Sequence, residues 1–425
     1  MDFSEFFKYH QDTKHSYFSV RNYPNRLSWE NQPKVFKTYE MYEKYELNID
    51  ILNHSFLYYI AGLNAKKTYP GVEYYLRMNP SAGALYPNEI YFQSRNNENI
   101  KDGIYHFDIV NMSITLLCLI ENNGIEKDIG IDSQVDGFIF FISSLYYRSS
   151  WKYKNRAFRY CLLDGGHILG SLEASCYLHD KSYTILYDFD KKFLNKKFGF
   201  NNEEFFQSCI IVGDITSKEV TTVDLNIKYV DGTYFFEENE VIQNAYKDSL
   251  KIIEAKKEKS KPSFYYDKDR FKNTIFKRRS IRDFSKQPIK KEEFFKILNI
   301  LNEPIPSDCD EKLDIYCVIN RVKGMPLGLF KSIDYIKKGD FINQAGYLCL
   351  EQDLGKDSAV TFFITSKAKN YQALYQKAGL IGHRLYLAAN YLGYGCSGIG
   401  AYYDDEVCTF LEDNTMVLYA LAIGN

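Results

Sequence analysis

RMNPSAGALYPNEIYF, residues 77–92, and WKYKNRAFRYCLLDGGHILGSL, residues 151–172, are the two stretches that organise the rest of the chain. In the first, Pro80 fixes its own φ angle, and Gly83 lets the backbone approach a ligand where a Cβ atom would obstruct. This pattern predicts an elbow of small residues that leads into a strand. In the second stretch, an aromatic and cationic patch precedes an apolar helix, which we expect to begin at Asp164 and the glycine pair after it.

The composition indicates a globular chain of two domains, because 425 residues are too many for one ordinary core. A net charge of −2 argues against a nucleic-acid partner. The sequence has no apolar run of membrane-spanning length, and its polar start does not resemble a signal peptide. We therefore expect no membrane association and a cytoplasmic location. The nine cysteines include no C-x-x-C pair, so neither a disulfide framework nor a metal site is favoured.

Hydrophobic periodicity predicts the elements of the N-terminal half. ILNHSFLYYIAGLNA (51–65) has apolar residues at helical spacing, and NEIYFQSR (88–95) follows the elbow as a strand. GIYHFDIVNMSITLL (103–117) alternates as a half-buried hairpin does, whereas FIFFISS (138–144) is a continuous apolar run typical of a central strand. QSCIIVGD (207–214) has the character of another buried strand.

The second half of the sequence repeats the first. FIFFISS returns as VTFFITS at 360–366, and the helix predicted at 164–178 returns at 378–392 with matched residues at one offset of 214. GIYHFDI is echoed by GLFKSID, and IIVGD by LAIGN. Ordered matches at nearly one offset indicate a tandem duplication of an α+β domain. The alternative is two unrelated α+β domains.

The predicted domain boundaries follow from this repeat. We place the first domain at residues 1–235, a linker at 236–263 and the second domain at 264–425. The linker is placed there because KIIEAKKEKSKPS, which begins at Lys251, is charged and cannot remain helical past its proline. We expect residues 1 to about 50 to form an arm with one short helix.

The two opening stretches resemble the nitroreductase-like flavoproteins and, within them, the SagB-type peptide dehydrogenases, which oxidise azoline rings to thiazoles and oxazoles in modified peptides. The resemblance is carried by the elbow with Arg77 before it, by the Lys152-Tyr153 pair, and by Arg156 and Arg159 ahead of a Leu-Asp-Gly-Gly-His stretch. It implies two tandem nitroreductase-like domains of the α+β class that form an intramolecular pseudo-dimer and bind FMN.

The resemblance also implies which residues bind FMN, and these are divided between the two repeats. FKRRSIRDF matches the segment that holds the phosphate, and a dianionic phosphate suits guanidinium groups and a hydroxyl. GYGCSGIGAYYDDEV matches the turn whose backbone N–H groups face the flavin ring, where Gly395, Gly398 and Gly400 would let the backbone approach. The implied cofactor-binding residues are Arg77, Pro80, Ser81, Ala82, Gly83, Arg278, Arg279, Ser280, Arg282, Ile399, Gly400 and Ala401.

The two repeats depart from the family pattern in complementary places. The N-terminal repeat has KVFKTYEMY (34–42) in place of the phosphate segment and LHDKSYTILYDF (178–189) in place of the glycine-rich turn. The C-terminal repeat has Pro-Ser-Asp-Cys at 306–309 in place of Pro-Ser-Ala-Gly, and it lacks a Lys-Tyr pair. We therefore expect one composite site and one FMN per chain.

Lys152 and Tyr153 are the catalytic residues that the resemblance implies. Azoline oxidation removes one hydrogen as a proton while a hydride goes to flavin N5, so a base is needed beside the flavin. The residue pattern alone leaves another interpretation open, in which Lys152 is a surface lysine and Tyr153 a core aromatic residue on an alternating strand. His167, near the expected helix start, fits a structural role better than a catalytic one.

The expected function is that of an FMN-dependent oxidoreductase that oxidises azoline rings in a modified precursor peptide, with a cyclodehydratase complex as a further partner. Two other functions stay open. An NAD(P)H-dependent nitro or quinone reductase would use the same fold and FMN without needing a Lys-Tyr base. A non-catalytic scaffold of a peptide-modifying complex would need no flavin, so flavin content separates it from both enzymes.

Overall fold

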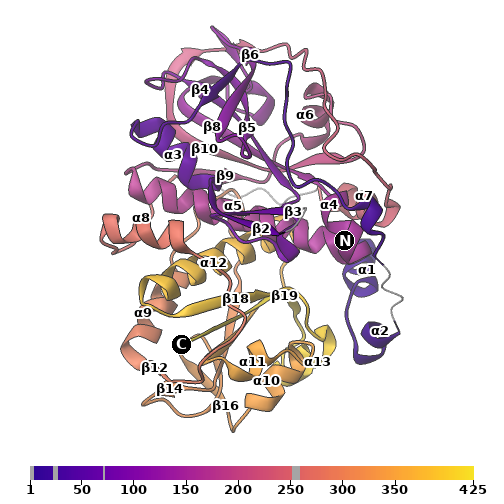
Figure 1. Cartoon of the computed structure of the whole chain (residues 1–425), viewed down its shortest axis with the longest axis vertical. Helices are drawn as coiled ribbons and strands as arrows, with labels where there is room; N and C mark the ends of the chain where they lie inside the picture. The colour runs from indigo at the N-terminus through magenta and orange to yellow at the C-terminus, as the bar shows by residue number, and fades with distance from the viewer. Residues whose placement is uncertain (1–3, 23–26, 70–71, 251–258) are drawn as a thin grey trace. The chain divides into compact units, whose positions relative to one another are not determined.

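A computed structural model describes residues 4–22, 27–69, 72–250 and 259–425 of the chain (Figure 1). The chain divides into two compact units. The N-terminal unit comprises Leu27–Ser263 and Pro306–Asp310. The C-terminal unit comprises Met1–Arg26, Phe264–Ile305 and Glu311–Asn425.

A seven-stranded antiparallel sheet forms the framework of the N-terminal unit. Its strands, in spatial order, are β1 (Lys44–Glu46), β6 (Ser113–Leu119), β5 (Gly103–Asp108), β4 (Asn88–Arg95), β8 (Ser133–Leu145), β10 (Glu204–Glu219) and β9 (Thr184–Leu186). Two smaller pairs accompany this sheet. They are the hairpin of β2 (Leu63–Tyr69) with β3 (Val72–Arg77), and β7 (Asn123–Gly124) with β11 (Thr221–Thr222).

Five α-helices accompany this sheet in the described part of the unit. They are α3 (Leu52–Ala61), α4 (Tyr147–Tyr153), α5 (Ala157–Leu178), α6 (Lys191–Lys197) and α7 (Glu240–Asp248). Helix α5 packs against β4, β8 and β10 and against α3. A Cβ atom at Gly165 of α5 would lie 2.4 Å from Gln207 Oε1 on β10. Glycine therefore lets this helix lie close to the sheet.

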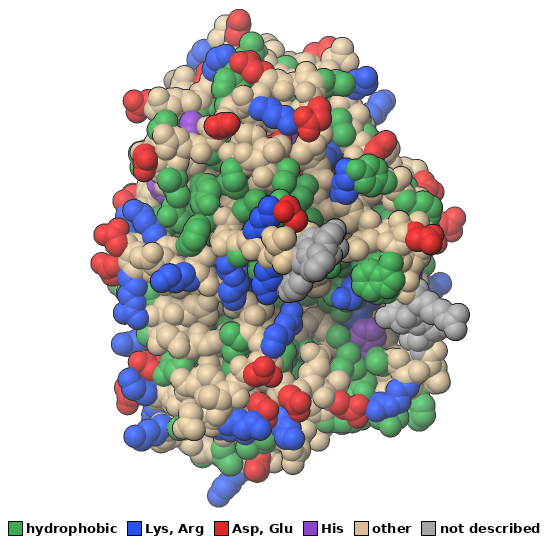
Figure 2. Space-filling view, in the orientation of Figure 1, with side chains coloured by type: hydrophobic (Ala, Val, Ile, Leu, Met, Phe, Trp, Pro, Cys, Tyr) green, Lys and Arg blue, Asp and Glu red, His purple; other side chains and the backbone are tan. Residues whose placement is uncertain are grey.

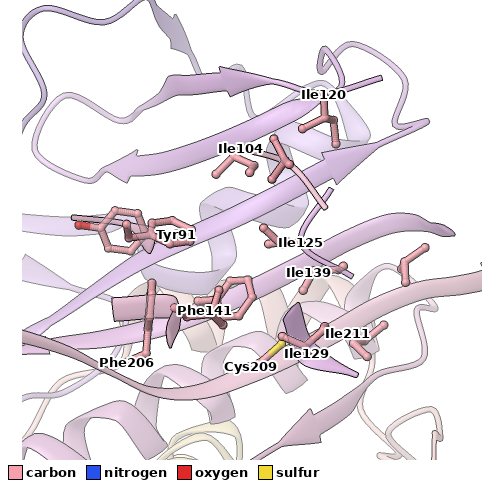
Figure 3. Close-up of a cluster of buried hydrophobic side chains, with 14 of the residues drawn as sticks. Tyr91, Ile104, Ile120, Ile125, Ile129, Ile139, Phe141, Phe206, Cys209 and Ile211 are labelled. Atoms are coloured by element: carbon pink, nitrogen blue, oxygen red, sulfur yellow. The ribbon is translucent and has the colours of Figure 1, made fainter. Parts of the chain in front are cut away.

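The core of the N-terminal unit extends over both faces of its sheet. Figure 3 shows one apolar cluster, to which strand β8 contributes Ile139 and Phe141. On the same strand, Phe138 and Phe140 contact Phe56 of α3. Because successive side chains of a strand point to opposite faces, both faces of β8 are buried. This burial explains the continuous apolar run and confirms the predicted central strand.

A six-stranded antiparallel sheet forms the framework of the C-terminal unit. Its strands, in spatial order, are β16 (Asp334–Lys338), β15 (Gly328–Lys331), β13 (Asp314–Ile319), β17 (Val360–Ser366), β19 (Met416–Gly424) and β18 (Gly395–Ile399). A short parallel pair joins β12 (Ile289–Lys290) to β14 (Val322–Lys323).

The long helix α12 of the C-terminal unit packs against β18 and β19 and against α8 and α9. Residues of α10, α11 and α13 join a separate apolar cluster with strands β13, β17 and β19. The helices of this unit are α1 (Ser4–Asp12), α2 (Tyr17–Arg21), α8 (Lys268–Lys277), α9 (Lys291–Leu301), α10 (Ile342–Leu348), α11 (Asp353–Asp357), α12 (Tyr371–Tyr391) and α13 (Asp404–Leu411).

The two sheets have the same strand order once the edge strand β1 is set aside. The order β6-β5-β4-β8-β10-β9 in one unit corresponds to β16-β15-β13-β17-β19-β18 in the other. FIFFISS lies on β8 and VTFFITS on β17, while IIVGD lies on β10 and LAIGN ends β19. Helices α5 and α12 follow equivalent strands. The predicted duplication of an α+β domain is therefore confirmed, and unrelated domains are excluded.

The predicted domain boundaries are wrong in two segments. Met1–Arg26 belongs to the C-terminal unit, where Lys14 Nζ lies 2.6 Å from Asp405 Oδ1. Pro306–Asp310 belongs to the N-terminal unit, where Asp308 accepts hydrogen bonds from the backbone that follows β9. These contacts join residues 391 and 121 positions apart, so no local pattern reveals them.

The predicted linker at 236–263 is structured in part. Helix α7 lies within it and packs against α5. The helix is capped by Asn239, whose side chain accepts a hydrogen bond from the Ile242 N–H at 3.1 Å. Residues 251–258, which carry most of the charged run, lie outside the described residues.

Two predicted helices have different ends in the structure. Helix α5 begins at Ala157 and not at Asp164, because the Asp164 carboxylate bonds to the elbow and does not cap its own helix. His167 consequently lies inside α5 and is buried, which agrees with a structural role. Helix α3 ends at Ala61, and strand β2 begins at Leu63.

Figure 2 shows basic side chains (lysine and arginine) and acidic side chains spread over the visible face. This distribution agrees with the small net charge of the whole sequence. Within the described ranges, none of the helices has both the length and the hydropathy needed to cross a membrane.

Candidate functional site

The elbow, residues 80–86, has a strained backbone. Gly83 has a φ angle of 65°, and Ala84 and Tyr86 have φ angles of 54° and 43°. Non-glycine residues rarely adopt this left-handed region, and each such residue costs roughly 1–3 kcal/mol unless its surroundings hold it. The contacts of the elbow with its neighbours must therefore supply that stabilisation.

Asp164 of helix α5 holds the first half of the elbow. Its carboxylate accepts a hydrogen bond from Ser81 Oγ at 2.6 Å and lies 3.2 and 3.3 Å from the backbone N of Ala82. Ser81 Oγ in turn accepts a hydrogen bond from the Tyr86 N–H at 2.8 Å. Burial raises the pKa of Asp164 to about 7, although the hydrogen bonds from Ser81 and Ala82 oppose this shift.

Arg77 was assigned to the cofactor on sequence grounds, and the structure contradicts direct contact. Its side chain is 1% exposed, and its guanidinium donates to the backbone carbonyls of Val35 at 2.6 Å and Asn88 at 3.3 Å. The guanidinium carbon also lies 4.5 Å from the centre of the Tyr86 ring. Arg77 therefore supports the elbow from inside the unit, because its guanidinium group donates its hydrogen bonds to neighbouring backbone carbonyls.

A buried ion pair supports the second half of the elbow. Arg148 Nη1 donates to the Tyr86 carbonyl at 2.9 Å and to Glu89 Oε1 at 2.6 Å, and His106 Nε2 lies 3.0 Å from Glu89 Oε2. Burial alone would raise the pKa of Glu89, but the charges of Arg148 and Arg77 and the His106 hydrogen bond lower it to about 2. Glu89 is therefore ionised at neutral pH, and it fixes Arg148 against the elbow.

Lys152 and Tyr153 converge on the bare backbone of Gly83. A Cβ atom built at Gly83 would lie 2.8 Å from Tyr153 Oη and 3.3 Å from Lys152 Nζ. Both residues end helix α4, so the interpretation of Tyr153 on an alternating strand is wrong. Both side chains are half-buried, and the Tyr153 ring packs against Tyr160 at a centroid distance of 4.4 Å. A cation and a phenol thus face a position that has no side chain.

In the C-terminal unit, the expected phosphate segment lies beside the expected ring-contacting strand. Ser280 forms an isolated parallel bridge with Cys396 of β18, and the Ile281 N–H donates to the Cys396 carbonyl at 3.2 Å. Tyr386 of α12 links the two segments, because its hydroxyl lies 2.8 Å from Ser280 Oγ and accepts from the Gly398 N–H at 2.6 Å. Residues more than 100 positions apart in the chain therefore form one sheet edge.

The three arginines of the phosphate segment differ in exposure. Arg278 is buried, and its guanidinium carbon lies 5.2 Å from the centre of the Tyr386 ring. Arg279 is half-buried and Arg282 is exposed. These three arginines flank Ser280 in the chain, and guanidinium groups and a hydroxyl supply the charge and the donors that a dianionic phosphate needs. The residues present on this edge therefore fit the phosphate of FMN.

The glycines of β18 have a different role from the expected one. A Cβ atom at Gly395 would lie 2.1 Å from Ile281 Cδ1, and one at Gly398 would lie 2.0 Å from Tyr419 Oη. Both distances are far below a van der Waals contact. The space beside these two glycines is thus filled by protein side chains. The expectation that they open room for a flavin ring is wrong for Gly395 and Gly398.

This packing predicts a test. Gly398→Ala should lower the free energy of unfolding by about 1–3 kcal/mol because the new methyl group overlaps the Tyr419 hydroxyl. The double variant with Tyr419→Phe should recover part of that loss, because it removes the overlapping oxygen. Urea unfolding of both variants measures the effect. Equal loss in the single and double variants would show that the hydroxyl is not the obstacle.

Sequence reasoning missed three functional roles in this region. Asp164 was identified as a helix start, Tyr386 was not singled out, and Asp308 was treated only as a departure from a pattern. An acidic residue followed by two glycines inside a long apolar helix was an available signal for Asp164, because such a carboxylate needs a buried partner. No signal in the sequence indicates Tyr386.

The comparisons with known proteins agree with this architecture. A solved structure from Anabaena variabilis, of a protein described as a nitroreductase, has a TM-score of 0.81 and 23% identity and covers 99% of both chains. The fold is accordingly that of two tandem nitroreductase-like α+β domains, as predicted. Residues 275–425 match the model of the Nitroreductase family.

Other solved structures match parts of the chain. The E. coli microcin synthetase McbBCD complex with truncated pro-MccB17 covers 49% of this chain and 87% of its own, at 14% identity and a TM-score of 0.32. Nitroreductase A from Vibrio parahaemolyticus covers 37% and 67%, at 18% identity and a TM-score of 0.28. No curated protein sequence matches this chain.

Proposed function

We propose that this protein is an FMN-dependent dehydrogenase that oxidises azoline rings in a ribosomally made peptide. The observation that carries the proposal is the convergence of Lys152 Nζ and Tyr153 Oη on the side-chain-free backbone of Gly83. A nitro or quinone reductase takes its hydride from a nicotinamide and needs no base at that position. An azoline substrate must also lose a proton, which an unprotonated lysine amine or a tyrosine phenolate can accept.

The proposed reaction removes two hydrogens from the azoline ring and leaves an additional double bond. Bound FMN supplies the two-electron acceptor for the hydride. Lys152 Nζ as the neutral amine, or Tyr153 Oη as the phenolate, accepts the proton from the adjacent ring carbon. Asp164 and Arg148 hold the elbow so that Gly83 stays in front of these two groups. The elbow thereby keeps the proton acceptors in a fixed position during turnover.

We propose that the chain binds one FMN and that the residues which the family resemblance assigns to the cofactor bind it. The C-terminal contribution is Arg278, Arg279, Ser280 and Arg282 for the phosphate, with backbone groups of Ile399, Gly400 and Ala401 for the ring. The N-terminal contribution is the backbone of Pro80, Ser81, Ala82 and Gly83. The support for the phosphate assignment is that three arginines flank Ser280 in the chain and that Ser280 pairs with Cys396 of β18.

The proposal is tested by incubating the purified protein with a peptide that carries thiazoline or oxazoline rings. Mass spectrometry should show the loss of two hydrogens for each ring, with the flavin absorbance bleached when oxygen is excluded. Efficient reduction of nitro compounds by NADPH, together with unchanged azoline peptide, would favour the reductase. A protein that holds no flavin after reconstitution would favour the scaffold.

Flavin binding gives a separate prediction. Arg282→Ala and Ser81→Trp should each weaken FMN binding about 10- to 100-fold, because one loses a charged contact worth about 1.5–3 kcal/mol and the other fills the elbow with a large ring. Fluorescence titration of the apoprotein with FMN measures the dissociation constant. Lys272→Ala is the matched control, since Lys272 is a half-exposed cation on α8 outside the phosphate segment. Wild-type affinity in both test variants would refute the residue assignment.

A further inference from the structure

The register of the two sheets identifies the part of the N-terminal unit that corresponds to the flavin-ring turn. Ile399 of β18 pairs with Ala420 of β19, and Leu186 of β9 pairs with Cys209 of β10. Ala420 and Cys209 are themselves equivalent, because LAIGN and IIVGD align at the same offset. Leu186 is therefore the counterpart of Ile399.

The next two residues follow from the same alignment. Tyr187 is the counterpart of Gly400, and Asp188 is the counterpart of Ala401. The N-terminal unit thus keeps the backbone position of the ring-contacting turn while its residues have changed. Tyr187–Asp188 is called the counterpart turn below.

An internal carboxylate occupies the backbone donors of the counterpart turn. Asp308 Oδ1 and Oδ2 accept from the Tyr187 N–H at 2.9 and 3.0 Å, and Oδ2 accepts from the Asp188 N–H at 2.9 Å. Asp308 is 2% exposed. Burial raises the pKa of Asp308, although the hydrogen bonds from the Tyr187 and Asp188 N–H groups and the positive charge of buried Lys191 oppose this shift. The carboxyl group of Asp308 therefore already occupies both N–H groups.

Backbone pairing holds this carboxylate in place. Ser307 forms a parallel bridge with Ile185 of β9. The Ile185 N–H donates to the Pro306 carbonyl at 3.0 Å, and the Asp308 N–H donates to the Ile185 carbonyl at 3.1 Å. The segment thus extends the sheet edge at β9. Asp308 stands at the position of Ala82 in the Pro-Ser-Ala-Gly elbow, so a single acidic substitution brings the carboxylate to the turn.

We infer that Asp308 is an internal anion that closes the counterpart turn of the N-terminal repeat, so that this second turn accepts no flavin. The inference rests on the proposed FMN function. The electron-rich N1 and O2 edge of a flavin needs the same pair of N–H donors, and a carboxylate and a flavin edge cannot share them. The closure explains why a duplicated chain would carry one FMN and not two.

A chemical rescue experiment tests the closure. Asp308→Ala leaves the two N–H groups buried without their acceptor, so Tm should fall by about 5–10 °C in chloride buffer. Sodium formate at the same ionic strength should restore most of that loss, because a small carboxylate can enter the vacated space. Wild-type protein should show no such difference between the two salts. Formate without effect on Asp308→Ala would overturn the inference.

Two variants control this measurement. Asp190→Ala also removes a carboxylate that accepts a hydrogen bond from a backbone N–H, at 2.9 Å. Asp190 caps an exposed helix end, where water can replace the carboxylate. Formate should therefore not restore the Tm of this variant. Asp308→Asn keeps the shape and fills the space, and its Tm should be insensitive to formate. If Asp308→Ala is insoluble in chloride, its yield of native protein on refolding in formate and in chloride gives the same comparison.

Flavin stoichiometry separates this inference from the proposed function. One FMN per wild-type chain agrees with both. Two FMN per chain would overturn the closure by Asp308 while leaving the flavin enzyme intact. No FMN after reconstitution would refute the proposed function, whereas the formate result would still report whether Asp308 fills an anion position.

Discussion

Lys152→Ala and Tyr153→Phe are each expected to lower the rate of azoline oxidation by about 10²- to 10⁴-fold, which is the usual loss when a general base is removed. The protein should keep its fold, because both side chains are half-buried at the end of α4 and face the backbone of Gly83. It should also keep its bound FMN. Rates with an azoline peptide, flavin absorbance and Tm are the measurements.

The control for this experiment is Lys154→Gln, which changes the next lysine without altering the pair at Gly83. Its rate should equal that of the wild type. A chemical reductant should bleach the flavin in all three variants, because reduction by a reagent does not require a group that accepts a proton from the substrate. If Lys152→Ala and Tyr153→Phe both oxidise the peptide at the wild-type rate, the general flavin reductase becomes the better description.

Asp164→Asn is expected to change how the free energy of unfolding depends on pH. Burial raises the pKa of Asp164 from 3.8 to about 7 in the folded protein. Between about pH 4 and pH 7 the folded state therefore binds a proton that the unfolded state has released. The contribution of Asp164 to stability is largest below about pH 4, falls as the pH rises to 7, and is constant above that.

The expected size of this effect is on the order of 4 kcal/mol, because each unit of pKa shift corresponds to about 1.4 kcal/mol. Asparagine does not titrate, so Asp164→Asn should gain stability relative to the wild type as the pH rises from 4 to 7. Urea unfolding at several pH values measures the difference. Ser81→Ala is the comparison, since it keeps the titrating carboxyl but loses a hydrogen bond that lowers the pKa of Asp164, so its stability should still fall with rising pH and continue to fall to a higher pH than in the wild type. If the free energies of unfolding of Asp164→Asn and the wild type differ by the same amount at every pH from 4 to 7, the raised pKa of Asp164 is contradicted.

The sequence by itself determined the repeated architecture. FIFFISS and VTFFITS are continuous apolar runs because each lies on a strand buried on both faces, so their pattern is local and readable. The order of matched segments then predicted two sheets with one topology. The elbow was also predictable, since Pro80 restricts its own φ angle and Gly83 permits conformations that other residues rarely adopt.

Only the tertiary structure decided what the individual polar side chains do. Asp164 reaches the elbow, and Asp308 reaches the counterpart turn, through contacts about 80 and 120 positions away in the chain. Gly398 is explained by Tyr419 on the neighbouring strand and not by a ligand. The periodicity of apolar residues indicates which face of a helix or strand is buried, and this pattern can be read from residues close together in the sequence. The partner of a buried carboxylate or the occupant of the space beside a glycine depends on which distant segments the fold brings together.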